Sequence, residues 1–414
     1  MKVAGDATGG CRVLIIHRYL WPENLSLYPA MLRDIAENHR AAGDDVTIAT
    51  ARASDPNAQH ERELWAADNG IELVEIDLPP DRGLPTLRRI AAIARFSMFA
   101  LGQAARRDYD AVSIASYPFL VAPSLVVLAA KARRRRSLFY VQDIISQRMA
   151  AVEGSKRVVG FAARQIDNLL ARSADVVVTL SADMKTTLGD RDNTLVLQNF
   201  IIDTPVAAIG PSDQEKIRPV QFVYAGNLGA AQNLPVLLDA ASIAARERDL
   251  EVVLIGDGSE MSSLRSQVGS LDPSPVQFRG LVSREQASRE VAQADVGVVA
   301  AEPGLFQSAW PSKTLSYLSQ GLPVLTMCEA DTSIALELSA ERIGLQGSPT
   351  DKQALANAMV AICDEVQSGT YDRATIATWA AGRYGRSTYF DAYNRHVRPA
   401  WLDVPCVSVT GVSP

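Results

Sequence analysis

Short apolar runs, many of them β-branched, alternate along the chain with longer stretches in which apolar residues recur at helical spacing. Between the first two runs, Met31 and Ile35 fall on one face of a helix predicted over Tyr28–Ala42. Gly43 is expected to end that helix in a left-handed conformation. The first half then contains six predicted strands, at Val13–Ile16, Val46–Thr50, Ile71–Ile76, Ala111–Ala115, Leu138–Val141 and Val176–Leu180.

The same alternation starts again after Ile201–Pro219, a proline-containing stretch that we interpret as a linker. Strands alternating with helices are typical of βαβ units and parallel sheets, so an α/β fold is expected. We predict an N-terminal Rossmann-like domain at 1–205, a C-terminal one at 206–385, and a closing helix and tail at 386–414. Strands of the second half are predicted at Gln221–Ala225, Glu251–Ile255, Val276–Phe278, Val296–Ala300 and Pro323–Thr326.

Composition agrees with a globular protein of two domains, because 414 residues exceed one ordinary core and hydrophobic residues make up 47%. No apolar stretch is long enough to span a membrane, and the first residues lack a signal-peptide pattern. The four cysteines form no CxxC pair and the four histidines show no metal-ligand spacing. We therefore expect a reduced, cytoplasmic protein without a metal or other cofactor.

The net charge of −6 is concentrated in the second half, which makes nucleic acid an unexpected partner. The first half nevertheless contains a basic, amphipathic stretch at Leu84–Arg107. Such a stretch could lie on an anionic membrane, or it could be a core-packed helix with snorkelling arginines. The basic residues are Arg88, Arg89, Arg95, Arg106, Arg107, Lys131 and Arg133–Arg136.

Three strands of the second half end in glycine, which lets a backbone approach an anion closely. One such turn could be an ordinary tight turn, but a nucleotide lying across the strand ends explains all three together. Pro311, Ser312 and Lys313 then open a short helix predicted at Thr314–Gln320, where first-turn N–H groups and Lys313 suit a diphosphate. The residues at the strand ends are Gly226, Asn227, Gly229, Gly256, Gly258 and Gly280.

With these motifs the sequence resembles the family-four retaining glycosyltransferases of the GT-B fold, in the bacterial branch that builds O-antigen and other polysaccharides. The resemblance covers nearly the whole chain. The segments that carry it are Tyr19–Glu23, Tyr140–Asp143, Ser173–Ser181, Tyr224–Gly229, Gly256–Gly258, Gln293–Asp295, Pro311–Leu318 and Gly321–Val324.

The resemblance implies that the second domain binds a nucleoside diphosphate sugar and the first binds the acceptor, with retention of configuration and no required metal. Lys313 would then balance the leaving diphosphate. Two departures stand out. Ser308 and Ser316 occupy positions where many relatives carry glutamates, and Ala230–Gln232 replaces a basic pair. We still count both serines among the donor-binding candidates, because a hydroxyl can bind a ribose or sugar hydroxyl.

Two acids of the first half are candidate catalytic residues. Asp143 follows the strand Leu138–Val141 and could act on the donor sugar or the acceptor, although it could equally cap a helix. Glu23 could act on the acceptor hydroxyl, or it could be an ordinary loop carboxylate.

These features predict a hexosyl- or N-acetylhexosaminyltransferase that uses a UDP-linked sugar and a glycan or polyprenyl-diphosphate-linked acceptor. It would work in the cytoplasm, at the inner face of the plasma membrane. Two alternatives stay open: a sugar-nucleotide epimerase of the same fold class, and a catalytically silent subunit that assists a partner transferase. Ser308 and Ser316 favour the second alternative.

Overall fold

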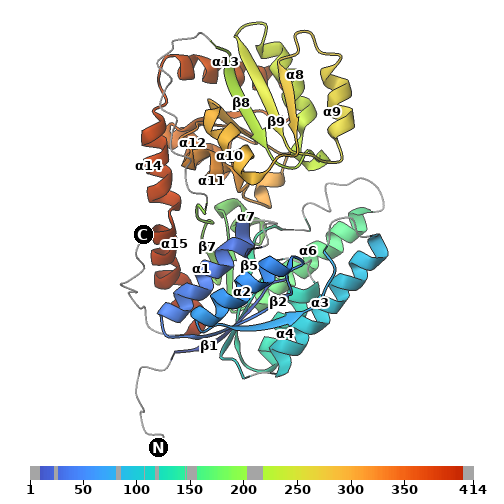
Figure 1. Ribbon diagram of the computed structural model, residues 1–414, viewed down its shortest axis with the longest axis vertical. Helices are drawn as coiled ribbons and strands as arrows, with labels where there is room; N and C mark the ends of the chain where they lie inside the picture. The colour runs from blue at the N-terminus through green and yellow to red at the C-terminus, as the bar shows by residue number, and fades with distance from the viewer. Residues whose placement is uncertain are drawn as a thin grey trace, which may run out of the picture. The chain divides into compact units, whose positions relative to one another are not determined.

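The computed structural model of the protein describes residues 10–22, 27–80, 85–106, 108–116, 121–144, 146, 156–202 and 218–403 (Figure 1). Contacts within the chain divide it into two compact units. The first contains Met1–Ile202, Ser308–Trp310 and Arg386–Pro414, and the second contains Asp203–Gln307 and Pro311–Gly385. The predicted boundary at 205/206 therefore falls on residues outside the described part of the chain.

The first unit is built on a parallel sheet with the strand order β3-β2-β1-β4-β5-β6-β7. Its central strands are buried almost throughout, as expected for apolar runs covered on both faces by helices. The strands are β1 (Arg12–Ile16), β2 (Asp45–Ala51), β3 (Glu72–Ile76), β4 (Ala111–Ala115), β5 (Arg136–Val141), β6 (Val176–Thr179) and β7 (Thr194–Val196).

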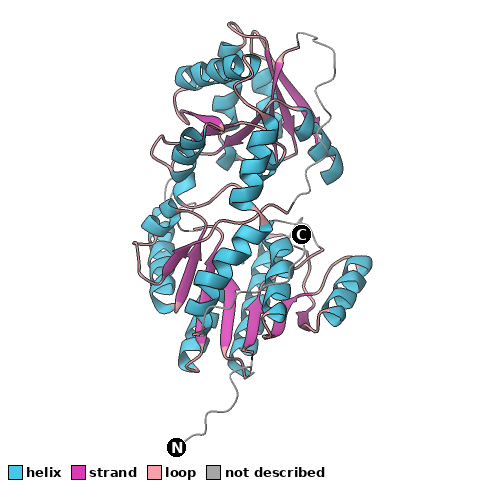
Figure 2. Cartoon of the chain, turned by 90° about the vertical axis from the view of Figure 1, so that its left-hand side faces the viewer, coloured by secondary structure: helices cyan, strands magenta, loops and turns pink. Residues whose placement is uncertain are grey.

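Helices cover both faces of this sheet (Figure 2). From β1 the chain adds strands toward one edge of the sheet, up to β3, and from β4 to β6 it adds strands toward the other edge. Because crossovers between parallel strands are right-handed, α1 (Leu27–Ala41) and α2 (Pro56–Asp68) lie on one face of the sheet. The same rule puts α3 (Thr86–Arg106), α4 (Val121–Ala132) and α6 (Lys156–Ser173) on the other, where they pack side by side (Figure 1). A short helix, α7 (Ala182–Thr187), connects β6 to β7.

Three C-terminal segments also belong to the first unit: α15 (Arg386–Ala392), the π-helical turn η3 (Tyr393–Val397) and α16 (Arg398–Leu402). A buried polar cluster joins them to the end of α1. Arg398 donates to both carboxylate oxygens of Asp44, at 2.8 and 3.1 Å, and His39 bonds the same carboxylate at 2.7 Å. All three side chains are buried. The hydrogen bonds between them offset the cost of burying the carboxylate and the guanidinium group.

The second unit is a smaller parallel sheet with the order β10-β9-β8-β11-β12-β13. Its strands are β8 (Val220–Ala225), β9 (Leu250–Ile255), β10 (Val276–Gly280), β11 (Val296–Ala300), β12 (Val324–Met327) and β13 (Gly344–Gly347). Its helices are α8 (Leu234–Ala244), α9 (Met261–Val268), α10 (Arg284–Gln293), α11 (Lys313–Ser319), α12 (Ser333–Glu341), α13 (Lys352–Gln367) and α14 (Arg373–Tyr384). Two short 3₁₀ turns, η1 (Ala230–Gln232) and η2 (Leu305–Gln307), follow β8 and β11.

Eleven of these strands lie where the sequence predicts them, within one or two residues, and Gly43 has the predicted positive φ of 86°. Two strands, β7 and β13, were not predicted. Arg136, which belongs to the predicted basic stretch, begins β5. Trp401, within the predicted closing helix and tail, is fully buried in α16.

Candidate functional site

Three glycines of the second unit lie next to one another at the carboxyl ends of β8, β9 and β10. The Gly226 N–H donates to the Ile255 carbonyl at 2.9 Å, and the Gly256 N–H donates to the Gly280 carbonyl at 2.8 Å. The predicted grouping of these strand ends is therefore present in the structure. In a parallel α/β sheet this is the edge at which ligands bind.

Packing of the strand ends already requires one of these glycines. A Cβ added to Gly256 would lie 1.9 Å from the Gly226 carbonyl oxygen, and its φ of 134° disfavours any side chain. Gly258 is similarly pressed against the Leu228 backbone, where a Cβ would lie 2.3 Å from the carbonyl oxygen. Their presence alone is therefore no evidence for a bound nucleotide.

Lys313 provides the evidence that the glycines do not. Its side chain runs from the start of α11 to the end of β8, where its Nζ lies 3.7 Å from the ring centroid of Tyr224. A Cβ on Gly226 would lie 3.2 Å from this Nζ, so glycine leaves room for the ammonium group. The cation thus sits at the strand end where the sequence lacks the basic pair of many relatives, with Ala230–Gln232 in its place.

No acid in the described part of the chain balances the charge of Lys313. Among the described residues no carboxylate lies within ion-pair distance of its Nζ, and burial lowers its pKa to about 7. The Tyr224 ring face attracts a cation, but it supplies much less stabilisation than a carboxylate. A partly buried amine of this kind gains most from an anionic ligand, which would restore its charge.

Two tyrosines fix the surroundings of this amine. The Tyr224 hydroxyl donates to the Asn227 carbonyl at 2.8 Å and lies 3.0 Å from Oε1 of Gln232, while the Ala225 N–H donates to the Tyr317 hydroxyl at 2.9 Å. Both rings are buried, and burial raises the pKa of each phenol. Neither tyrosine was singled out from the sequence, although both lie inside the motifs that carry the resemblance.

The predicted role of the helix start at 311–314 needs correction. The α11 helix begins at Lys313, one residue earlier than predicted, and is only seven residues long. Ser312 is exposed and its side chain makes no capping hydrogen bond, and the Thr314 N–H is already bonded to the Pro311 carbonyl at 3.1 Å. The Lys313 side chain is therefore the main anion-binding feature of this segment, and the backbone is secondary.

The remaining donor-binding candidates are divided between the two units. Gly229 precedes η1 and faces the Asn227 side chain, and Ser316 is half-buried on α11. Ser308 is fully buried and belongs to the first unit, where its carbonyl accepts a hydrogen bond from the Ile144 N–H at 2.8 Å. The structure thus brings Gly226, Gly256, Gly280 and Lys313 together, and Ser308 belongs to the first unit.

At the carboxyl edge of the first sheet, polar groups are mostly bonded to one another. The Ser116 hydroxyl accepts hydrogen bonds from the backbone N–H groups of Gln142 and Asp143, at 3.1 and 3.2 Å. The Gln142 amide pairs with Asn199, and half-buried Asp143 forms a backbone bridge with Ala309. The helix that Asp143 could cap would fall mainly on residues 147–155, outside the described part of the chain.

Glu23, the second catalytic candidate, also lies outside the described residues. His17, directly after β1, is a further polar group at the carboxyl edge of the first sheet, and the sequence pattern did not single it out. It is buried, and burial lowers its pKa to about 4, so its imidazole is neutral at pH 7. A neutral imidazole at this edge can accept or donate a hydrogen bond without adding charge.

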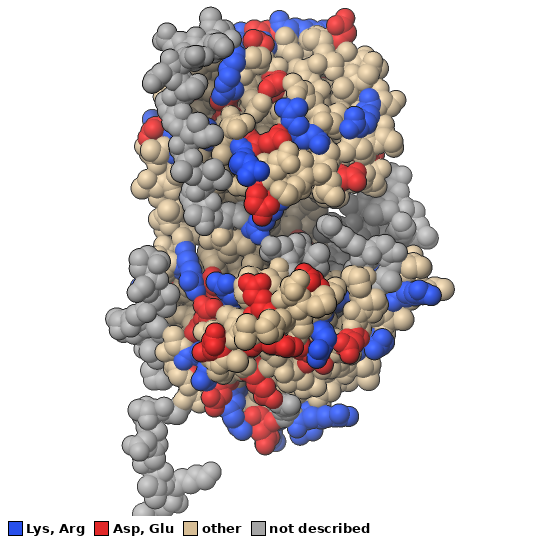
Figure 3. Space-filling model, in the orientation of Figure 1, with Lys and Arg blue, Asp and Glu red and all other residues tan. Residues whose placement is uncertain are grey.

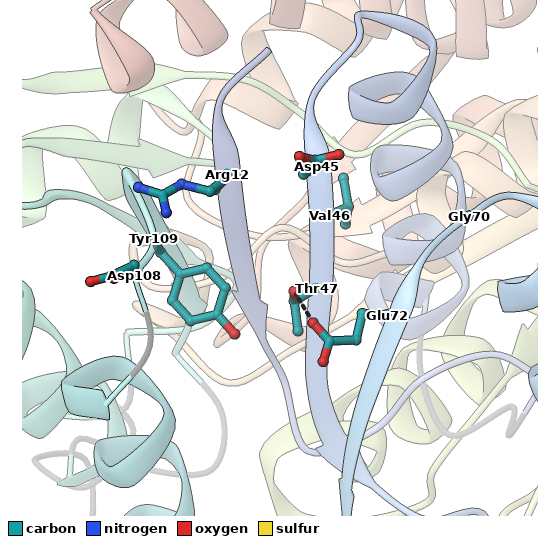
Figure 4. A pocket seen from close by; sticks show the side chains of 8 residues that line it. All are labelled: Arg12, Asp45, Val46, Thr47, Gly70, Glu72, Asp108 and Tyr109. Atoms are coloured by element: carbon teal, nitrogen blue, oxygen red, sulfur yellow. Dashed lines mark hydrogen bonds between the residues drawn. The ribbon is translucent and has the colours of Figure 1, made fainter. Parts of the chain in front are cut away.

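A cavity of about 390 Å³ opens at the opposite edge of the first sheet (Figure 4). Its lining includes Arg12 and Asp45, which begin β1 and β2, and Tyr109, which precedes β4. The Thr47 hydroxyl donates to Glu72 across its wall at 2.9 Å. Because ligands of parallel α/β sheets bind at the carboxyl ends of strands, we assign this amino-end cavity no role in catalysis.

Two family models match the chain and between them cover most of it. Residues 29–197 match a "Glycosyl transferase 4-like domain", and residues 219–365 match "Glycosyl transferases group 1". A probable glycosyltransferase of Pseudomonas aeruginosa, WbjE, is 26% identical over 143 residues. That match covers 34% of this chain and 36% of the relative.

Solved structures resemble nearly the whole chain. HepE of Anabaena, crystallised in complex with UDP, aligns with a TM-score of 0.66 at 18% identity, over 93% of this chain and 99% of that one. Sucrose-phosphate synthase of Thermosynechococcus elongatus aligns with a TM-score of 0.71 at 16% identity, over 95% and 100%. At these identities the likeness shows the fold, and it confirms the predicted fold class.

Proposed function

Since the chain carries both glycosyltransferase domains on a GT-B fold, we propose that it transfers a sugar from a nucleotide-sugar donor to a glycan or polyprenyl-diphosphate-linked acceptor. The observation that carries this proposal is the amine of Lys313, which has no acidic partner among the described residues and lies at the glycine-lined ends of β8, β9 and β10. A diphosphate is the anion that a nucleotide sugar would bring there. The donor would be UDP-linked, since the structurally similar HepE was crystallised with UDP.

In this proposal the second unit holds the donor. The ammonium of Lys313 would pair with the diphosphate and stabilise it as it leaves, the role that divalent cations fill in many sugar-nucleotide enzymes. The nucleoside would lie over Gly256 and Gly280, and Asn227 and Gly229 would border the diphosphate. Ser316 would offer a hydroxyl to the ribose. No separate cofactor is needed, because the nucleotide sugar is itself the co-substrate.

The first unit would hold the acceptor. Asp143 would orient hydroxyl groups of the sugar or acceptor, or stabilise oxocarbenium charge, and Glu23 would act on the acceptor hydroxyl. Transfer would retain the configuration of a hexosyl or N-acetylhexosaminyl group. No described helix combines the length and apolar character needed to cross a membrane. Work on a lipid-linked acceptor would bring the enzyme to the inner face of the plasma membrane.

Turnover of isotope-labelled donors tests the proposal, after a thermal-shift screen of UDP- and GDP-sugars has found the nucleotide that binds. Transfer of label to a glycan or lipid-linked acceptor is the expected result. Isomerisation of the donor without transfer would instead identify an epimerase. Absence of nucleotide binding in a folded protein would overturn the donor assignment.

A second candidate function is that of a silent subunit which binds a partner transferase. The observation that favours it is the absence of both glutamates, together with the burial of Ser308. Nucleotide binding without turnover in the pure protein, with turnover restored only by a partner, would support this alternative. Restoration of activity by Ser316→Glu would point the other way, to an enzyme weakened at one contact.

A further inference from the structure

Exposed apolar side chains are unevenly distributed over the molecule. In the described part of the chain twelve large apolar side chains are exposed, and eight of them belong to α3, α4 and α6. These three helices pack side by side on one face of the first sheet (Figure 1). We call their outer surface the α3–α4–α6 face, and its apolar residues are Leu87, Ile90, Met98, Val121, Leu128, Phe161, Ile166 and Leu169.

These side chains are not part of the core. Helix α3 already has a separate buried stripe that includes Ala92, Phe96 and Ala100, and the buried side of α6 includes Ala163 and Leu170. Each helix therefore has an apolar stripe that is buried and a second one that faces solvent. Leu87 is 80% exposed and Phe161 is 66% exposed, so the described residues leave the second stripe open to solvent. An apolar surface of this extent marks a binding surface.

The charges on this face have one sign. Helices α3 and α4 contain no acidic residue, and the only acid of α6, Asp167, is buried and accepts a hydrogen bond from the Ser146 N–H. Over much of the surface drawn in Figure 3, by contrast, acidic and basic side chains lie close to one another. The exposed cations on or beside the α3–α4–α6 face are Arg88, Arg89, Arg95, Arg106, Lys131, Arg133, Arg134, Arg164 and Arg172.

We propose that the α3–α4–α6 face docks on an anionic lipid bilayer, with its apolar side chains in the interface and its arginines among the headgroups. Apolar residues interspersed with cations, on three helices that expose no acidic side chain, match both the apolar interface and the anionic headgroups of such a bilayer. In a homodimer formed through this face, the cations of one copy would lie against the cations of the other, and this repulsion disfavours such a dimer. This proposal extends the proposed function. It rests on that function only for the purpose of docking, which would be to bring the enzyme to a lipid-linked acceptor.

The direction of the helices adds to the argument. Each of the three follows a strand, so its first turn lies at the carboxyl edge of the sheet, the edge assigned to the acceptor. Leu87 and Val121 lie in the first turns of α3 and α4, and Ile90 and Phe161 lie in the second turns of α3 and α6. The docked surface therefore extends to the edge at which a lipid-linked acceptor would have to arrive.

Flotation of the full-length protein with vesicles tests this inference. The vesicles are phosphatidylcholine alone and phosphatidylcholine with about a third phosphatidylglycerol, at low and high salt. One variant removes apolar contacts (Leu87→Gln, Ile90→Gln and Phe161→Gln), and another removes charge (Arg88→Gln, Arg89→Gln, Arg133→Gln and Arg134→Gln). Matched controls change exposed residues elsewhere: Leu64→Gln with Leu336→Gln for the apolar set, and Arg284→Gln with Arg289→Gln for the charged set.

We expect salt-sensitive binding to the anionic vesicles, at least tenfold weaker in both test variants and unchanged in both controls. Equal binding to neutral vesicles, or equal losses in the controls, would overturn the proposal. So would a concentration-dependent dimer in solution that the apolar variant abolishes, because the face would then join two copies. UDP affinity, measured on the same variants without vesicles, should not change; its absence in the unmodified protein would count against the proposed function and not against the docking surface.

Discussion

The two units use partly or fully buried charge in opposite ways. In the first unit Asp44, His39 and Arg398 are buried together, and the carboxylate is bonded by both partners. Burial alone would raise the pKa of Asp44, but the hydrogen bonds from His39 and Arg398 outweigh it and leave the pKa below its usual value. In the second unit Lys313 lies against an aromatic ring face, the described residues offer it no acid, and burial lowers its pKa to about 7.

The difference separates a structural charge from one that is available to a ligand. A buried charge with all its partners in the same chain stabilises that chain's fold, and an outside ion could add little. A partly buried amine without a counter-ion costs stability until an anion arrives. The four predictions below test this contrast, from the largest expected effect to the smallest.

Removal of Asp44 should have the largest effect, and the effect should be on stability. Asp44→Ala leaves His39 and Arg398 buried without their carboxylate, which should lower the free energy of unfolding by about 3–5 kcal/mol. Urea titration measures the loss. The control is Asp45→Ala, whose side chain is 78% exposed and should matter by less than about 1 kcal/mol. A loss in Asp44→Ala as small as in the control would show that the cluster is not structural.

Asp143 tests whether the first unit also contributes a charge to chemistry. Asp143→Asn keeps the size of the side chain and removes its charge, so turnover should fall about 100-fold while melting temperature and UDP affinity stay nearly the same. Single-turnover rates and thermal melts measure both, with Asp192→Asn, an exposed aspartate of the same unit, as the control. A fully active Asn variant would exclude the catalytic role. Lost stability of about 1 kcal/mol in Asp143→Ala with normal turnover would indicate a cap.

Lys313 should show the reverse of Asp44, with a loss of binding and no loss of stability. Lys313→Ala should weaken UDP binding by about 1.5–3 kcal/mol, which is the value of a charge-assisted contact. Its free energy of unfolding should stay the same or rise, because an unpaired, partly buried amine is removed. Calorimetric titration and urea unfolding measure the two effects. Lys352→Ala, which removes an exposed lysine paired with Asp239 in the same unit, should leave UDP affinity unchanged.

The pH dependence of UDP binding should follow the lowered pKa of Lys313, about 7. Below that pH the free protein already carries the ammonium, so the charge required for the diphosphate is present. Above it the amine is neutral and binding must also take up a proton, so the dissociation constant should rise by up to about tenfold per pH unit. Titrations between pH 7 and 9 measure the slope. Lys313→Arg should flatten it, since arginine stays charged, and a steep slope retained in that variant would assign the proton to another group.

The strands could be predicted from the sequence because buried parallel strands are continuous apolar runs. This is true of β1, β4 and β11, which lie within a residue of their predicted positions. The two strands that were missed lack such a run. Strand β7 has three residues, and β13 reads Gly-Leu-Gln-Gly. Such short strands show no hydrophobic periodicity that could predict them. They are stabilised by pairing with a longer neighbouring strand.

The site could be predicted in part. The glycines and Lys313 were found because each lies in a short motif, but the sequence does not reveal that Lys313 reaches Tyr224. That contact joins segments far apart in the chain, as does the pairing of Asp44 with Arg398. The sequence also predicted free first-turn N–H groups at this helix start, whereas the turn uses the Thr314 N–H internally. Long-range contacts and turn geometry are the two features that a residue pattern does not determine.

The most direct test of the central claim compares UDP with uridine on the unmodified protein and on Lys313→Ala. The two ligands differ only in the diphosphate, so the cycle isolates the contact between the Lys313 amine and that group. We predict that the variant loses about 1.5–3 kcal/mol of affinity for UDP and almost none for uridine. Equal losses for both ligands, or no loss for either in a folded variant, would contradict the assignment of Lys313 to the diphosphate.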